Sequence, residues 1–148
     1  MNYINQENST RILAIDYGDS KVGLAISDLM KIIAKPYKTI KNISQKNVIN
    51  NIKEIIDDKS IEEIVIGLPK TLKNTFSQQT IKVEAFAQKL EIKIDIPLIR
   101  YDERLSSIEA KRSLIFQGIK TGHNKEYIDM TAAAIFLQSY LDEKSNTK

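Results

Sequence analysis

The stretch RILAIDYGDSKVGLAIS, residues 11–27, decides the fold. It opens with a short apolar run that ends in an acid, Asp16, and continues into the turn residues Tyr-Gly-Asp-Ser. A second apolar run follows at once. Short apolar runs separated by turn residues are typical of neighbouring strands. The stretch therefore predicts a buried strand over 11–16, a tight turn, and a second strand over 21–27.

The chain beyond this hairpin predicts a mixed sheet covered by helices. The further strands are expected over 32–40, 63–67 and 94–101, and the helices over 45–59, 76–90, 106–117 and 126–142. Pro36 indicates an edge or a bulge in the third strand, and Ser106 with Glu109 forms a capping box at a helix start. A meander followed by helical crossovers is an α/β order with mixed strand pairing.

Two helices are indicated by apolar residues at helical spacing. The residues expected to be buried are Val48, Ile49, Ile52, Ile55 and Ile56 in the first helix, and Ile81, Val83, Phe86, Ala87 and Leu90 in the second. Each set forms a one-sided apolar stripe, so each helix is expected to pack against the sheet.

Length and composition place the chain among ordinary globular proteins. It has 148 residues, of which 42% are hydrophobic and 28% charged, and we expect one domain over 11–143, a flexible segment over 1–10 and a polar tail over 144–148. No apolar run reaches the roughly 20 residues of a membrane span, residues 1–10 do not resemble a signal peptide, and there is no cysteine. We therefore expect a cytoplasmic protein without a membrane partner. The formal charge of +3 is compatible with a polyanionic partner but does not identify one, and the oligomeric state stays open.

Asp16 is the first candidate functional residue, because it lies at the end of a buried strand. A charge there is costly unless it has a partner, and a bound cation would be one. The alternative is that Asp16 only accepts hydrogen bonds from the turn amides of Gly18 and Asp19. From this residue alone, both interpretations stay open.

A second acidic cluster, Asp102-Glu103, follows the last expected strand and precedes Arg104. Ligands of α/β sheets lie beyond the carboxyl ends of the strands. Adjacent side chains of a strand point to opposite sides, so only one of these two acids is expected to face Asp16. We favour Glu103, with Arg104 forming an ion pair with the other acid.

Asp129 is the third candidate acid, in the first turn of the last expected helix. The helix dipole favours an anion there, and this alone would account for it. Three carboxylates from distant segments can, however, hold Mg²⁺ or Mn²⁺. Two such ions about 4 Å apart would activate a water and stabilise the leaving oxygen of a phosphodiester.

Other catalytic chemistries lack their residues. The chain has one histidine, His123, so a zinc site of several histidines is excluded. It has no cysteine nucleophile, no G-x-S-x-G turn and no P-loop pattern. Metal-assisted hydrolysis is the reaction class that remains.

Four blocks of the sequence together resemble the YqgF family of pre-16S rRNA nucleases, distant relatives of the RuvC-type Holliday junction resolvases. The blocks are ILAIDYG with VGLAISD (Ile12 to Asp28), IVIGLP (Ile64 to Pro69), YDERLSS with EA (Tyr101 to Ala110), and IDMTAAAIFLQSYLD (Ile128 to Asp142). They cover nearly the whole chain after Thr10, and their order and spacing make the resemblance specific.

The resemblance implies an RNase H-like three-layer α/β fold with a mixed sheet of about five strands. It also implies a nuclease that depends on Mg²⁺ or Mn²⁺ and processes the 5′ end of pre-16S rRNA in ribosome biogenesis. By motif, the catalytic acids would be Asp16, Glu103 and Asp129, with Asp102 as a further candidate metal ligand.

The chain departs from the family pattern at two places. Lys21 stands where the family has an arginine, and it supplies a point charge in place of a bidentate fork. The loop after IVIGLP reads KTLKNT and contains Lys70 and Lys73, where the family has an acid and a glycine. We expect Lys21, Lys70, Lys73 and Arg104 to bind the phosphates of a nucleic acid without reading its sequence.

Other functions stay open at this point. One is resolution of Holliday junctions or other branched DNA, since no identifiable residue would contact the 2′-hydroxyl that distinguishes RNA. Another is a noncatalytic nucleic-acid-binding module in ribosome assembly. Phosphotransfer of the actin-like ATPase type would need a second domain, for which this chain has no room.

Overall fold

A five-stranded mixed sheet forms the centre of the molecule. The computed structural model describes residues 9–69, 77–106 and 125–146, and of residues 125–131 it describes the backbone alone. The strands are β1 (Arg11–Tyr17), β2 (Lys21–Ser27), β3 (Ala34–Lys41), β4 (Ile61–Leu68) and β5 (Leu98–Asp102), in the order β3-β2-β1-β4-β5. β1, β2 and β3 pair antiparallel, whereas β4 runs parallel to both β1 and β5. The predicted meander and crossovers are confirmed.

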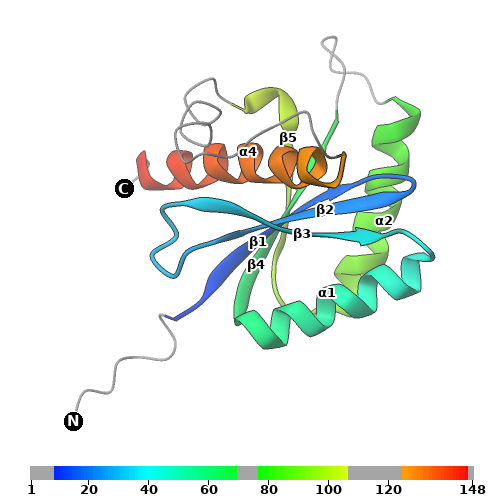
Figure 1. Cartoon of the computed structure of the whole chain (residues 1–148), viewed down its shortest axis with the longest axis horizontal. Helices are drawn as coiled ribbons and strands as arrows, with labels where there is room; N and C mark the ends of the chain where they lie inside the picture. Colours follow the sequence, from blue (N-terminus) through cyan, green and yellow to red (C-terminus); the bar gives the residue numbers. More distant parts are fainter. Residues whose placement is uncertain (1–8, 70–76, 107–124, 147–148) are drawn as a thin grey trace.

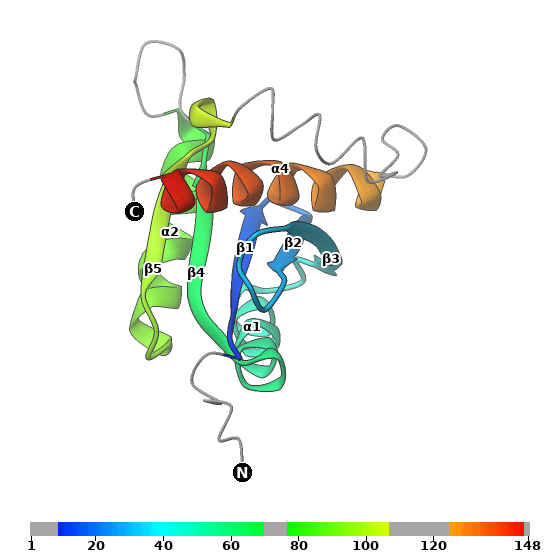
Figure 2. The same cartoon turned by 90° about the vertical axis from the view of Figure 1, so that its left-hand side faces the viewer.

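Helices cover both faces of the sheet, so the fold has three layers (Figures 1 and 2). The helices α1 (Gln45–Lys59) and α2 (Gln78–Lys93) pack on one face, and α4 (Lys125–Asn146) crosses the other. The side chains of Ser44 and Ser77 cap the first turns of α1 and α2 by accepting a backbone N–H. A short 3₁₀ helix, η2 (Glu103–Leu105), follows β5. The three-layer α/β fold expected from the sequence is confirmed.

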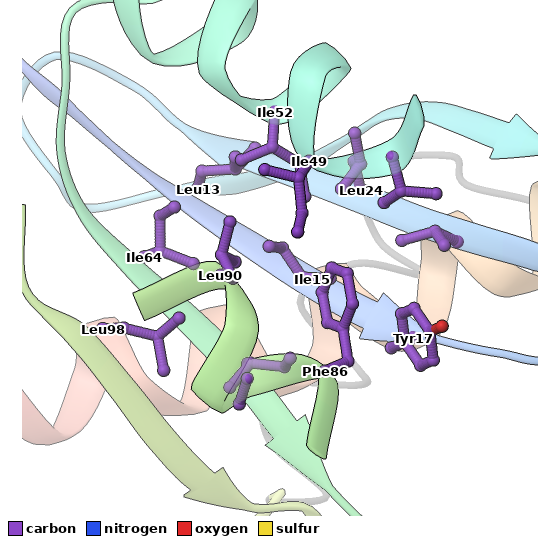
Figure 3. Packing of buried hydrophobic residues seen from close by; sticks show 14 of the residues in the cluster. Leu13, Ile15, Tyr17, Leu24, Ile49, Ile52, Ile64, Phe86, Leu90 and Leu98 are labelled. Atoms are coloured by element: carbon purple, nitrogen blue, oxygen red, sulfur yellow. The ribbon is translucent and has the colours of Figure 1, made fainter. Parts of the chain in front are cut away.

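The alternation of side chains along β1 divides the core into two parts. Leu13, Ile15 and Tyr17 point toward α1 and α2 (Figure 3), whereas Ile12 and Ala14 point toward α4. Tyr17 stacks on the α2 residue Phe86, with ring centroids 4.1 Å apart. Because both faces are buried, β1 reads as a continuous apolar run, which is the property that made it recognisable in the sequence.

The third strand lies at an edge of the sheet, as its proline indicated. Pro36 pairs with Ala25, next to a shift of register between β2 and β3. A proline cannot donate a backbone hydrogen bond and is tolerated at an edge or a bulge, and β3 provides both.

Several predicted boundaries differ from the structure. α1 has the expected bounds, but α2 extends to Lys93, so β5 starts at Leu98 and not at Ile94. α4 begins at Lys125 and continues to Asn146, so residues 144–146 are helical and not part of a tail. The structure describes Ser106 but not residues 107–117, so the helix expected over 106–117 and its capping box lie outside the described residues except for Ser106. None of the described helices has the length and apolarity that crossing a membrane would require.

One predicted core residue is wrong. Ile81 is 60% exposed, whereas its neighbour Thr80 is fully buried. The buried positions of α2 are Thr80, Val83, Phe86, Ala87 and Leu90. Thr80 tolerates this position because its hydroxyl donates a hydrogen bond to the carbonyl oxygen of Pro69.

Candidate active site

The carboxyl ends of three parallel strands meet at one edge of the sheet, and acids are found there. Register pairs Ile15 with Ile66 in β4, so the next residue of β1, Asp16, lies beside Gly67. Gly67 in turn pairs with Tyr101 of β5, and Glu103 follows directly after the last residue of β5, Asp102. Asp16 and Glu103 are 87 positions apart in the chain, yet the parallel pairing brings their strand ends to the same edge.

The alternation of side chains places Asp16 on the face of the sheet that α4 covers. Ile12 and Ala14 belong to the core cluster on that face, and Asp16 continues their series. In β5, Tyr101 belongs to the same cluster, so Asp102 points toward the other face. Asp16 is partly buried at this position.

The side chain of Glu103 lies over β4 at Gly67. A Cβ atom at residue 67 would be 2.6 Å from Glu103 Oε1 and 2.7 Å from Cε2 of the α4 residue Phe136. Real Cβ atoms do not approach other atoms so closely, so a larger residue at this position would displace Glu103, Phe136 or the strand. Glycine at position 67 therefore provides the space in which Glu103 lies between β4 and α4, on the same face as Asp16.

Glu103 is electrostatically coupled to Asp16. Its pKa is raised from 4.5 to about 7, first by burial and then by the negative charges of Asp16 and Asp102. Burial disfavours the charged carboxylate, and a nearby like charge disfavours it further. A buried acid with a raised pKa beside a second acid is typical of a functional site.

The neighbouring acid, Asp102, has a different partner. It caps η2 by accepting a hydrogen bond from the backbone N–H of Arg104, at 3.0 Å. The Arg104 guanidinium also donates from Nε to both carboxylate oxygens of Asp102, at 3.0 Å each. The ion pair that the sequence predicted for one of the two acids is thus present at Asp102. This geometry favours Glu103 as the acid that acts together with Asp16.

Lys21 lies near the acids at the same edge. The turn between β1 and β2 is closed by a backbone bond, in which the Gly18 N–H donates to the carbonyl oxygen of Lys21 at 3.0 Å. Gly23 pairs with Asp16, and Lys21, two residues before Gly23, lies on the same face of β2 by alternation. Lys21 also pairs across the sheet with Lys41 of β3. Two lysines therefore lie beyond Asp16 at this edge.

Some of the predicted site residues are not described. Asp129 lies in α4, as expected, but its side chain is outside the described part of the structure. Lys70, Lys73 and His123 also lie outside it. Among the side chains that are described, no three acids or histidines form a group that could hold a metal ion. The three-acid arrangement around Asp16 therefore remains a prediction.

The two acids that are brought together fit a hard divalent cation by their chemistry. Both offer carboxylate oxygens, which Mg²⁺ and Mn²⁺ prefer. The repulsion that raises the pKa of Glu103 would be relieved by a positive ion near it. A raised pKa of Glu103 next to Asp16 is therefore compatible with binding of a cation at this place.

Sequence reasoning missed one residue of this site, Gly67. The motif IVIGLP placed it at a strand end but gave no reason for a glycine there. A glycine near the end of an apolar strand indicates close approach of another group, and this signal was available. Only the structure identifies the groups that approach Gly67, because Glu103 and Phe136 come from distant parts of the chain.

Comparison with known proteins gives a match over most of the chain. The family model described as "RuvX: Holliday junction resolvase" matches residues 10–143. A protein of Clostridioides difficile (strain 630) is 42% identical over 137 residues, which are 93% of this chain and 97% of that protein. A protein of Thermoanaerobacter pseudethanolicus is also 42% identical over 137 residues, which are 92% of this chain and 99% of that protein. Both are named "Putative pre-16S rRNA nuclease".

Two solved structures with a similar fold are resolvases. The structure of Thermus thermophilus RuvC in complex with a Holliday junction substrate has a TM-score of 0.58 at 14% identity, covering 93% of this chain and 97% of that one. The yeast mitochondrial Holliday junction resolvase Ydc2 has a TM-score of 0.57 at 8% identity, covering 93% of this chain and 80% of that one. At such identities the likeness shows the fold alone, which is RNase H-like.

Proposed function

Because the chain belongs to the RuvX family and is a nuclease, we propose that it processes the 5′ end of pre-16S rRNA. The reaction is hydrolysis of a phosphodiester bond, it depends on Mg²⁺ or Mn²⁺, and it is a step of ribosome biogenesis in the cytoplasm. The observation that carries the proposal is the coupling of Asp16 and Glu103 at one edge of the sheet. A cation bound between two acids that repel each other would relieve this repulsion.

Asp16, Glu103 and Asp129 are the residues that would hold the cation, and two ions are proposed. When bound, the ions would stabilise the negative charge that develops on the phosphodiester during hydrolysis. Glu103 is partly protonated near neutral pH, because its pKa is about 7. It must lose this proton to bind a cation, so the affinity for Mg²⁺ or Mn²⁺ should increase as the pH rises through about 7.

Asp102 and Arg104 have a positioning role in this proposal. Their ion pair and the bond from Asp102 to the Arg104 backbone hold the η2 turn that carries Glu103. Arg104 is exposed, so it can also meet a phosphate at the rim. Lys21 is proposed to contact the phosphate backbone from the β2 side, with Lys70 and Lys73 from the loop after β4.

We propose precursor rRNA and not branched DNA as the substrate, because the relatives named for pre-16S rRNA are more similar in sequence to this chain than the resolvase bound to a DNA junction. The proteins named for pre-16S rRNA are 42% identical to this chain, whereas the RuvC bound to a Holliday junction is 14% identical. Resolution of branched DNA is the second candidate, and it is favoured by the shared fold and the family description.

The experiment that tests the proposal compares cleavage of two substrates by wild type and Asp16→Asn. Asparagine keeps the size of Asp16 and its hydrogen-bonding oxygen but removes the charge that a divalent cation requires. With Mn²⁺ and a pre-16S rRNA leader, single-turnover cleavage should fall by about 100-fold or more, which corresponds to about 3 kcal/mol. Filter binding of the RNA in calcium should not become weaker, because the substitution removes a negative charge that would repel the phosphates.

Asp19→Asn is the matched control. Asp19 lies in the same turn, is exposed, and pairs with Lys82 at 3.4 Å. The control should cleave at the wild-type rate. If Asp16→Asn also cleaves at that rate, the metal-dependent mechanism is wrong. If wild type cuts a four-way DNA junction but not the RNA, the substrate is branched DNA, and if it cuts neither, the noncatalytic module is the better reading.

A further inference from the structure

The helices α1 and α2 form a groove on the face of the sheet opposite α4. It has a volume of about 500 Å³ and is lined by residues 45–53 of α1 and 89–93 of α2. Its charged lining residues are Lys46, Lys53, Lys89 and Lys93, and none of the carboxylates in the described part of the chain lines it. We call these four residues and the hollow between them the lysine groove. Asp16 and Glu103 lie on the α4 face, so the sheet separates the two sites (Figure 1).

The charge of the lysine groove exceeds that of the whole chain. Its four cations compare with a formal charge of +3 for all 148 residues together. The adjacent hollow is lined by Asp57 and Asp95 as well as by Lys53 and Lys93, so carboxylates lie near two of the four lysines. A groove of one charge between low-dielectric walls concentrates the electric field and attracts counter-charges.

The four lysines are exposed side chains that line one groove from two helices. Lys89 and Lys93 are one helical turn apart, a spacing at which like charges destabilise a helix. Lys89 Nζ donates a hydrogen bond across the groove to Gln45 Oε1 at 2.7 Å, which links the two walls. An anion placed between the walls would contact lysines of both helices and reduce their mutual repulsion.

We propose that the lysine groove binds the phosphate backbone of structured RNA, as a second contact remote from the acids. This rests on the proposed function, because it assumes an RNA large enough to pass around the sheet and reach both faces. A protein partner fits the groove less well. Interfaces between proteins are depleted in lysine and enriched in aromatic residues, methionine and arginine, and the lining contains none of the enriched types. Lysines act as point charges and bind phosphates without reading sequence.

The test neutralises the four lysines together and measures binding of a pre-16S rRNA precursor as a function of salt. The groove variant carries Lys46→Gln, Lys53→Gln, Lys89→Gln and Lys93→Gln. The control variant loses the same charge elsewhere, through Lys35→Gln, Lys38→Gln, Lys59→Gln and Lys144→Gln. Binding is measured in calcium, so that the result does not depend on cleavage.

The groove variant should bind the precursor at least about tenfold more weakly than the control at moderate salt. The slope of log Kd against log salt should decrease by about 3, because each phosphate contact contributes about 0.7 to 0.9. Cleavage of a short hairpin that reaches only the acids should be unchanged. Equal precursor binding by the two variants would overturn the proposal. The proposal would also be overturned if poly-glutamate displaced the precursor from the wild-type protein as effectively as RNA of the same total charge. This result would assign the groove to an acidic protein.

The lysine groove and the proposed nuclease mechanism can fail independently in these experiments. If wild type cleaves no substrate but the groove variant still loses precursor binding, the lysine groove stands and the nuclease mechanism fails. If the hairpin is cleaved normally and precursor binding is unaffected, the mechanism stands and the groove proposal fails.

Discussion

Replacing Glu103 by glutamine is expected to stabilise the metal-free protein at pH 8 and to abolish its cleavage activity. Glutamine has nearly the same shape, so it fits the space above Gly67, but it carries no charge. The pKa of Glu103 is raised from 4.5 to about 7 in the folded protein. The native state therefore keeps a proton that the unfolded state has lost, and the free energy of unfolding of the wild type decreases as the pH rises from about 4.5 to about 7.

The magnitude follows from the size of the shift. A change from 4.5 to about 7 corresponds to about 3 kcal/mol, and solvent screening of a partly exposed side chain reduces this to about 1–2 kcal/mol. At pH 8 the glutamine variant should be more stable than wild type by this amount. At pH 4.5 the difference should nearly vanish, because the wild-type side chain is then mostly protonated in the native state.

The assay is urea denaturation in EDTA at several pH values, repeated with saturating Mn²⁺ at pH 8. Manganese should stabilise the wild type more than the variant, since a ligand that binds only the native state adds to its stability. Glu91→Gln is the control, because Arg100 lowers the pKa of Glu91, so its neutralisation should not stabilise the protein at pH 8. A Glu103→Gln protein that is less stable than wild type at pH 8 in EDTA would refute the reasoning.

Three further changes test the site. Gly67→Ala should lower the free energy of unfolding by about 1–3 kcal/mol and reduce cleavage, because the added Cβ would displace Glu103 or Phe136. Thermal melts and single-turnover cleavage measure the two effects. Unchanged values in both assays would contradict this prediction. Asp102→Asn should reduce cleavage by less than about tenfold, much less than Glu103→Gln, if Asp102 only positions η2; an equal loss in the two variants would make Asp102 a ligand as well. Lys21→Gln should leave the melting temperature unchanged and decrease the salt slope of RNA binding by about 1, and a slope equal to that of wild type would remove Lys21 from the contact surface.

Much of the fold could be predicted because its signals are local. β1 and β2 are apolar runs that flank a turn, and α1 has both its apolar stripe and its capping serine in the sequence. Side-chain alternation predicted that only one of Asp102 and Glu103 faces Asp16 if the strand continues through both. β5 ends at Asp102 and Glu103 begins η2, so this argument does not apply, although Asp102 is paired to Arg104 and Glu103 is coupled to Asp16.

The remaining features depend on contacts between distant segments. Ile81 was predicted to be buried from the helical spacing of apolar residues, but the buried stripe of α2 passes through Thr80, whose hydroxyl donates a hydrogen bond to the carbonyl oxygen of Pro69. The role of Gly67 depends on Glu103 and Phe136, which are brought to it by β5 and α4. No pattern within a short window of sequence contains such information.

The acid Glu103 directly follows an edge strand of the described sheet. β5 has five residues and, within the described sheet, pairs with β4 alone, and two of its side chains form hydrogen bonds to helices. Arg100 donates to Glu84 and Glu91 of α2, and the Tyr101 hydroxyl donates to Glu143 of α4 at 2.9 Å. Edge strands open locally more readily than central ones. Fraying of β5 would separate Glu103 from Asp16 while the rest of the core stays folded, so heat should inactivate this protein before it melts.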